Sequence, residues 1–108
     1  MKTAAFLALL LIGNCAAAAE PYPDASPAQI GALQNGIEHG CLNAGKRKGG
    51  DPAHVTAVCK CVIQVLKSDV TPDEWNKAVY LAMRHQNEES NAVILSHSGK
   101  MATCRTSH

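Results

Sequence analysis

Two cysteines, Cys59 and Cys61, lie two residues apart in the middle of one amphipathic segment, residues 51–68. Asp51 and Pro52 suit the N-cap and the first position of a helix. Apolar residues then recur at helical spacing: Val55, Val58, Cys59, Val62, Val65 and Leu66. Because successive helical residues turn by about 100°, the two cysteines point about 200° apart, Cys59 into the apolar face and Cys61 onto its flank. We therefore expect each cysteine to bond a different element of the fold.

Residues 1–19 have the features of an export signal. Lys2 provides a positive start, residues 6–12 an apolar core, and residues 17–19 the small residues of a cleavage site. The apolar run is too short to span a bilayer. We expect cleavage after Ala19, an unstructured lead-in at residues 20–25, and a single helical domain at residues 26–108.

Cys15 raises a second interpretation of the N-terminus. Residues 11–15 (Leu-Ile-Gly-Asn-Cys) resemble a bacterial lipoprotein signal, but such a signal needs a small residue directly before the cysteine, and Asn14 is not small. We therefore favour a periplasmic or secreted protein over a lipid-anchored one.

Four cysteines remain after the signal: Cys41, Cys59, Cys61 and Cys104. An even number in a short exported chain indicates two disulfides, each of which adds about 2–4 kcal/mol to a small core. The helical spacing disfavours a Cys59–Cys61 bond. We favour Cys41–Cys59 with Cys61–Cys104, and Cys41–Cys61 with Cys59–Cys104 remains the alternative.

The pattern of caps and apolar faces predicts an all-α fold of three to four short helices, with a central antiparallel helical hairpin. A first helix begins at Ser26 and Pro27 and buries a face of Ile30, Leu33, Ile37 and Cys41. A third begins at Thr71, where Thr71 and Glu74 have capping-box spacing and Val70 can pack on Trp75. Residues 86–91 are polar and should break or fray the third helix, before a fourth helix at residues 92–104.

A ridge of small residues runs along the first predicted helix: Ala32, Gly36, Gly40 and Ala44. Such a ridge allows another backbone to approach closely. The favoured explanation is packing against a helix of the same chain. The alternative is a homodimer through the Gly36/Gly40 face.

The net charge of the chain limits the classes of partner that we expect it to bind. The chain has ten Lys and Arg residues, one of which is Lys2, against nine Asp and Glu residues. This near-neutral balance argues against nucleic acid and against an anionic membrane surface. The run Lys46-Arg47-Lys48 reads first as a solvated turn and second as a contact for an acidic partner. Tyr80 and Met83, which lie off the buried face of their helix, are a second candidate contact.

No enzyme motif is present, so we expect neither an active site nor a cofactor. A copper or zinc site is the chemical alternative, with His39, His54, Cys59 and Cys61 as its ligands. It would require reduced thiolates, which an oxidising compartment disfavours.

The order of Cys41, Cys59-Lys60-Cys61 and the helix start at residues 71–75 (Thr-Pro-Asp-Glu-Trp) resembles that of small exported bacterial helical proteins. Some immunity proteins, which block toxins delivered into the periplasm, share this build. The resemblance implies a non-enzymatic protein-binding module, in its sharpest form an immunity or inhibitor protein. The alternatives are a metal or small-ligand carrier that uses the Cys/His set, and a pH-responsive envelope chaperone, which the five histidines suggest.

Overall fold

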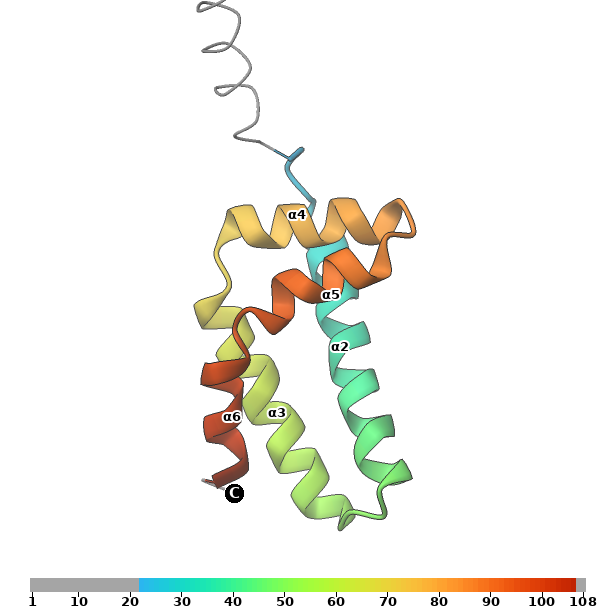
Figure 1. The fold of residues 1–108 in the computed structure, drawn as a ribbon, viewed down its shortest axis with the longest axis vertical. Coiled ribbons are helices and arrows are strands. Elements are labelled where there is room, and N and C mark those ends of the chain that lie inside the picture. Colours follow the sequence, from blue (N-terminus) through green and yellow to red (C-terminus); the bar gives the residue numbers. More distant parts are fainter. Residues whose placement is uncertain (1–21, 107–108) are drawn as a thin grey trace, which may run out of the picture.

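The structure, a computed structural model, describes residues 22–106. The predicted export signal and Cys15 lie outside these residues. The described part is all-helical, with five helices and no strand: α2 (Pro27–Arg47), α3 (Pro52–Asp69), α4 (Pro72–Met83), α5 (Asn87–Leu95) and α6 (Ser98–Thr106) (Figure 1).

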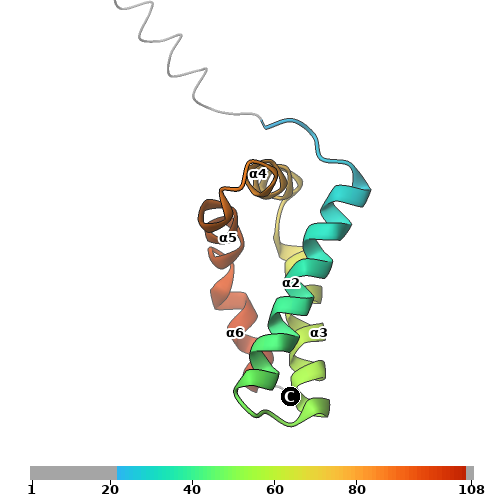
Figure 2. The same cartoon turned by 90° about the vertical axis from the view of Figure 1, so that its right-hand side faces the viewer.

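The helices form two layers closed at one end by α4. Helices α2 and α3 lie side by side and run in opposite directions, while α5 and α6 follow each other on the other side (Figures 1 and 2). Helix α4 crosses the end at which α2 begins and α3 ends, and α5 packs against α4. Helix α3 is central because it contacts both α2 and α6.

A small apolar core lies where these helices meet. Trp75 is 5% exposed and Leu66 is fully buried. The buried cluster draws on α3, α4, α5 and the α3–α4 junction: Ile63, Leu66, Val70, Trp75, Ala78 and Ile94. Three residues of the predicted inward face of α2 pack against it: Ile30, Leu33 and Ile37. The predicted contact region of Val70 and Trp75 is therefore the centre of the core.

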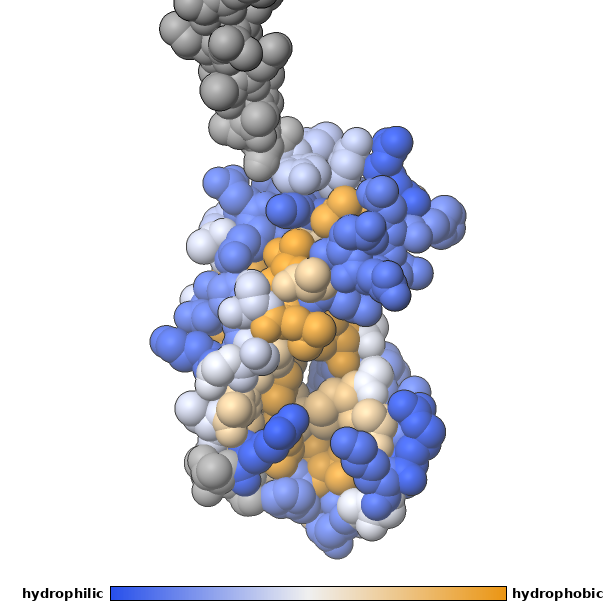
Figure 3. All heavy atoms as spheres, in the orientation of Figure 1, coloured by the Kyte–Doolittle hydropathy of each residue, from blue (hydrophilic) through white to orange (hydrophobic). Residues whose placement is uncertain are grey.

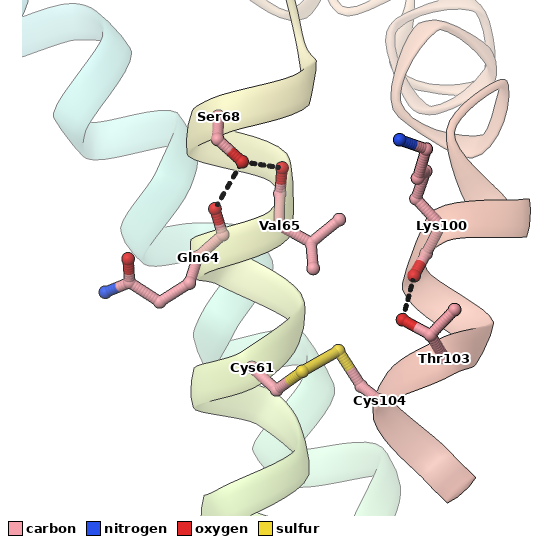
Figure 4. The surroundings of a disulfide bond; sticks show 7 residues. All are labelled: Cys61, Gln64, Val65, Ser68, Lys100, Thr103 and Cys104. Atoms are coloured by element: carbon pink, nitrogen blue, oxygen red, sulfur yellow. Dashed lines mark hydrogen bonds between the residues drawn. A yellow bond between two sulfur atoms is a disulfide. The ribbon is translucent and has the colours of Figure 1, made fainter. Parts of the chain in front are cut away.

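Two disulfides connect α3 to its neighbours. Cys41–Cys59 joins α2 to α3, and Cys61–Cys104 joins α3 to α6. Figure 4 shows the second bond crossing between its two helices. This is the pairing that the sequence favours, and each cysteine of the Cys-x-Cys pair bonds a different element.

The helix starts follow the predicted caps. Thr71 Oγ1 accepts from the Glu74 N–H at 3.2 Å, and Glu74 Oε1 accepts from the Thr71 N–H at 2.9 Å. The Asp51 carboxylate accepts from the His54 N–H at 3.0 Å. Ser26 forms a second capping box with Gln29, which the sequence analysis did not identify.

The predicted break after the third helix exists, but it is shorter and earlier than residues 86–91, because α4 ends at Met83 and α5 begins at Asn87. The chain turns earlier, at His85, whose φ is +62°. Residues 87–91 are helical although polar, and one of them is buried against α4: the Ser90 hydroxyl donates to the Ala78 carbonyl at 2.8 Å. A second turn before Ser98 divides the predicted fourth helix into α5 and α6, so the described residues contain five helices where three to four were expected.

The lead-in is fixed in place although residues 22–26 form no helix or strand. The Ala25 N–H donates to Asn76 Oδ1 at 2.9 Å, and Asn76 Nδ2 donates to Asp24 Oδ1 at 3.2 Å. The rings of Tyr22 and Tyr80 lie 5.1 Å apart. These contacts attach the lead-in to α4, so the described part of the segment expected to be unstructured is held against the domain.

The small-residue ridge does not contact another part of the described chain at its two central glycines. A Cβ added to Gly36 or Gly40 would have no neighbour within 4 Å. The favoured explanation, close packing within the chain, is therefore wrong at these positions. The close approach occurs one turn further on, at Gly45, which packs against Val55. The homodimer through Gly36 and Gly40 stays a prediction.

Candidate binding surface at the turn between α2 and α3

The two predicted contact regions lie at opposite ends of the fold. Lys46, Arg47 and Lys48 are exposed at the turn between α2 and α3, whereas Tyr80 and Met83 belong to α4 at the other end (Figure 1). Tyr80 is only half-exposed, because Tyr22 packs on its ring and Arg84 lies 5.2 Å from the ring centre. Met83 is 63% exposed. The structure therefore does not combine the two regions into one surface.

A cavity of about 330 Å³, which we call the basal pit, lies beside the cationic turn. Its walls come from α2, α3, the turn and the end of α6. They consist of Cys41, Ala44, Gly45, Lys48, Gly50, His54, Val55, Val58, Cys59 and Arg105. Figure 3 shows an apolar hollow in the lower half of the molecule with hydrophilic side chains on both sides. The Cys41–Cys59 disulfide belongs to the lining and fixes the distance between the α2 and α3 walls.

Two glycines shape the base of the pit. A Cβ at Gly45 would overlap Cγ1 of Val55 and lie 2.9 Å from its Cγ2. A Cβ at Gly50 would lie 2.8 Å from Cγ2 of the same valine. Val55 thus packs directly on glycine backbone, and the turn is completed by Gly49 at φ +75°, a conformation that glycine adopts without steric cost.

The ionisable side chains in the lining of the pit are all of basic types. Lys48, His54 and Arg105 line it, and its lining includes no Asp or Glu. Within residues 22–106, no ion pair engages Lys48 or Arg105. The nearest acidic residue in the sequence, Asp51, uses its carboxylate to cap α3. The pit therefore combines an apolar interior with basic side chains and no carboxylate in its lining, which suits an anionic ligand with an apolar part.

Two other hollows differ in chemistry. A larger one, of about 520 Å³, lies between α4 and α5, and its lining includes Lys77 together with Glu74 and Glu89. A groove of about 360 Å³ between α2 and α4 includes Met83 and has no charged residue in its lining. Only the basal pit, among these three, has charges of a single sign.

The ligands of the copper or zinc alternative do not assemble into a site. Cys59 and Cys61 are both in disulfides, so neither sulfur is a free thiolate. His39 and His54 are exposed. In the part of the chain that the structure describes, no group of three or more His, Cys, Asp or Glu side chains is placed to hold a metal ion. The copper or zinc alternative with this ligand set is therefore not retained.

A cluster around His97 is a feature that the sequence analysis missed. His97 Nδ1 lies 2.6 Å from Asp69 Oδ2, and Nε2 lies 3.0 Å from Glu74 Oε1. Lys100 Nζ lies 3.7 Å from the second oxygen of Asp69. The cluster joins the end of α3, the first turn of α4 and the α5–α6 junction. No local pattern reveals it, because His97 is 28 and 23 residues from its partners.

These contacts change the acidity of all three groups. The hydrogen bond to Asp69 and the contacts with Glu74 raise the pKa of His97 above its usual 6.5. The hydrogen bond with His97 lowers the pKa of Asp69. The Thr71 N–H and then His97 lower the pKa of Glu74. These contacts favour the charged form of His97 between two ionised carboxylates, which is a structural ion-pair cluster rather than a nucleophile–base pair.

Comparison with protein-family models, with curated proteins and with solved structures finds no match for this chain. Among the helices of residues 22–106, none combines the length and apolar character that a bilayer crossing needs.

Proposed function

We propose that this chain is a non-enzymatic, exported binding protein that presents a rigid, disulfide-linked surface to a protein partner. The contact region is the basal surface, which we define as Lys46, Arg47, Lys48 and the rim of the basal pit. The observation that carries this proposal is the basal pit, where unpaired basic side chains surround an apolar cavity with no carboxylate in its lining. The two disulfides and the absence of a membrane-spanning helix among the described residues fit a periplasmic or extracellular location.

The basal surface supports binding better than the Tyr80–Met83 region does. Its two long helices are linked directly by a disulfide, so little conformational freedom is lost when a partner docks. Its exposed Lys and Arg side chains would attract an acidic partner over a distance and orient it on approach. An immunity or inhibitor protein is the sharpest form of this proposal, and its partner would then be a toxin or an enzyme with an acidic surface.

The chaperone alternative requires the fold to loosen near pH 5. The His97 cluster opposes this, since at pH 5 His97 is protonated and the lowered pKa values of Asp69 and Glu74 keep both carboxylates ionised. The contact between α3, α4 and the α5–α6 junction is then at its strongest. The His97 cluster therefore favours a rigid binding protein over a pH-responsive chaperone.

Charge reversal tests the proposal. The oxidised protein, immobilised, is used to capture partners from the envelope and secreted fractions of the source organism. The triple variant K46E/R47E/K48E should lose a partner that the wild type retains. For the wild type, affinity for that partner should fall as salt rises, and the variant should have lost this dependence, because screening acts on the exposed charges.

The matched control is K60E/K67E, which reverses two exposed lysines of α3 outside the basal pit. It should retain the partner. A partner that binds the triple variant as tightly as it binds the wild type would remove the basal surface from consideration. A partner lost equally by both variants would show that only net charge matters.

A further inference from the structure

The basal pit has the dimensions of a small-molecule site. Its volume of about 330 Å³ lies at the lower end of the range of roughly 300–1,000 Å³ typical of ligand pockets. Apart from its basic residues, its lining is apolar: Ala44, Gly45, Gly50, Val55, Val58 and the Cys41–Cys59 disulfide. A cavity of this size holds one narrow apolar group rather than a large ring system or a folded segment.

The basic side chains indicate which charge the exposed end of a bound apolar group should carry. Lys48 comes from the turn after α2, His54 from the first turn of α3, and Arg105 from the last turn of α6. Lys48 and His54 are close in the sequence and Arg105 is distant from both, so the fold brings basic groups of three elements to one apolar cavity. Lys and Arg donate strong, charge-assisted hydrogen bonds to a carboxylate, and Arg can do so with two parallel bonds.

The walls of the pit are fixed before any ligand arrives. The Cys41–Cys59 bond holds α2 against α3 beside the cavity, and Val55 packs on the backbone of Gly45 and Gly50. A pre-formed apolar cavity loses little entropy when it is filled, so an alkyl chain can bind there through apolar burial alone. The basic groups then discriminate between head groups, because only an anionic head group gains charge-assisted hydrogen bonds from these exposed side chains.

We propose that the basal pit binds one medium-length alkyl chain that ends in a carboxylate. The chain lies against Ala44, Val55 and Val58, and the carboxylate is held by Lys48 and Arg105. This inference goes beyond the proposed protein–protein contact and does not depend on it, since it requires no partner protein.

The experiment compares three probes with the same ten-carbon chain on the purified, oxidised protein: sodium decanoate, decanol and decyltrimethylammonium. Each is titrated below its micelle concentration and followed by two-dimensional ¹H–¹⁵N NMR. Decanoate should bind at least about tenfold more tightly than decanol, the difference that one charge-assisted hydrogen bond can supply. The cation should bind more weakly still. The decanoate-induced shifts should centre on residues 44–58 and on Arg105.

Two variants locate the site. K48Q/R105Q removes two exposed charges and should weaken decanoate at least about tenfold, while leaving decanol unchanged. Its matched control, K60Q/K67Q, removes two exposed lysines of α3 and should bind decanoate like the wild type. V58T, which replaces a pit-lining methyl with a hydroxyl at similar size, should weaken decanoate and decanol alike.

Three results would each overturn the inference: equal binding of decanoate and decanol, shifts centred on the α2–α4 groove, and no saturable binding of decanoate. A failure here would leave the proposed function intact if K46E/R47E/K48E still loses its protein partner. If decanoate binds saturably but K46E/R47E/K48E still binds the protein partner like the wild type, the small-ligand site stands and the proposed protein contact does not.

Discussion

His97 joins three parts of the described chain by polar contacts: the end of α3, the first turn of α4 and the α5–α6 junction. Its side chain is 13% exposed, and its partners Asp69 and Glu74 are 31% and 34% exposed. A protonated imidazole donates from both ring nitrogens and so satisfies both carboxylates, whereas a neutral imidazole can donate to only one of them. Lys100, on α6, adds a further positive charge beside Asp69.

The variant H97Q should therefore lower the free energy of unfolding in a pH-dependent way. The contribution of His97 is complete below its unfolded pKa of about 6.5 and is lost as pH rises through its raised folded pKa. The contributions of Asp69 and Glu74 are present above their usual pKa values of 3.8 and 4.5 and are lost as pH falls through their lowered folded values. The difference between wild type and H97Q, measured by urea unfolding, should be largest between about pH 4.5 and 6.5.

At pH 8 that difference should shrink, and H39Q, which changes an exposed histidine of α2, should match the wild type at every pH. A destabilisation by H97Q that does not change with pH would mean that the imidazole acts by packing alone.

At the scale of elements, α2 shows how one residue type has different roles at different positions. Gly36 and Gly40 are exposed in the middle of the helix with open space where a Cβ would lie. Gly45 lies near the C-terminal end of the same helix, directly against Val55 of α3. Glycine costs about 1 kcal/mol relative to alanine inside a helix. That cost is offset by a close contact only at Gly45.

Two alanine substitutions should consequently have opposite signs. G36A should raise the free energy of unfolding by about 1 kcal/mol, because it restores helix propensity without a clash. G45A should lower it by about 1–3 kcal/mol, because Val55 is stiff and cannot move aside freely. The double variant G45A/V55A should recover part of that loss. Thermal and urea unfolding measure all three.

Stabilisation by G45A would show that α2 and α3 separate easily at the turn. Sedimentation of G36A and the wild type tests the predicted homodimer at the same time, since a dimer packed through Gly36 would be weakened by the added methyl group.

At the scale of the whole molecule, the two disulfides compensate for a core that is small. The buried apolar cluster is confined to the region where α3, α4 and α5 meet. Helix α6 has a single cysteine, Cys104, that is fully buried, and most of its remaining described side chains are exposed. The Cys61–Cys104 bond is therefore the main link between α6 and the rest of the fold, whereas α2 and α3 are also joined by a short turn.

Removal of one disulfide at a time should show that the Cys61–Cys104 bond contributes more to the free energy of unfolding than the Cys41–Cys59 bond. Cys61 and Cys104 are 43 residues apart in the sequence, and Cys41 and Cys59 are 18 residues apart. The chain-entropy relation then gives losses of about 4 kcal/mol for C61A/C104A and about 3 kcal/mol for C41A/C59A. Urea unfolding of the two double variants, each the control for the other, gives the order. A larger loss for C41A/C59A would mean that the packing of α2 on α3 depends on its disulfide more than α6 does.

The sequence by itself determined the features that depend on near neighbours or on covalent chemistry. Helix starts at Ser26, Asp51 and Thr71 follow from side chains that cap within three residues. The separate partners of Cys59 and Cys61 follow from the 100° turn between helical residues. The inward faces of the helices follow from apolar periodicity, which burial then enforces.

Only the tertiary structure decided the features that depend on contacts between distant residues. Residues 87–91 form part of a helix that packs on α4, where the Ser90 hydroxyl donates to the Ala78 carbonyl, a partner that polarity and spacing do not reveal. The His97 cluster and the basal pit each combine residues from three or more elements. Gly36 and Gly45 look alike in the sequence, yet only Gly45 has a neighbour. Periodicity tells which face of a helix is buried, whereas the identity of what lies opposite is set by how all the helices pack together.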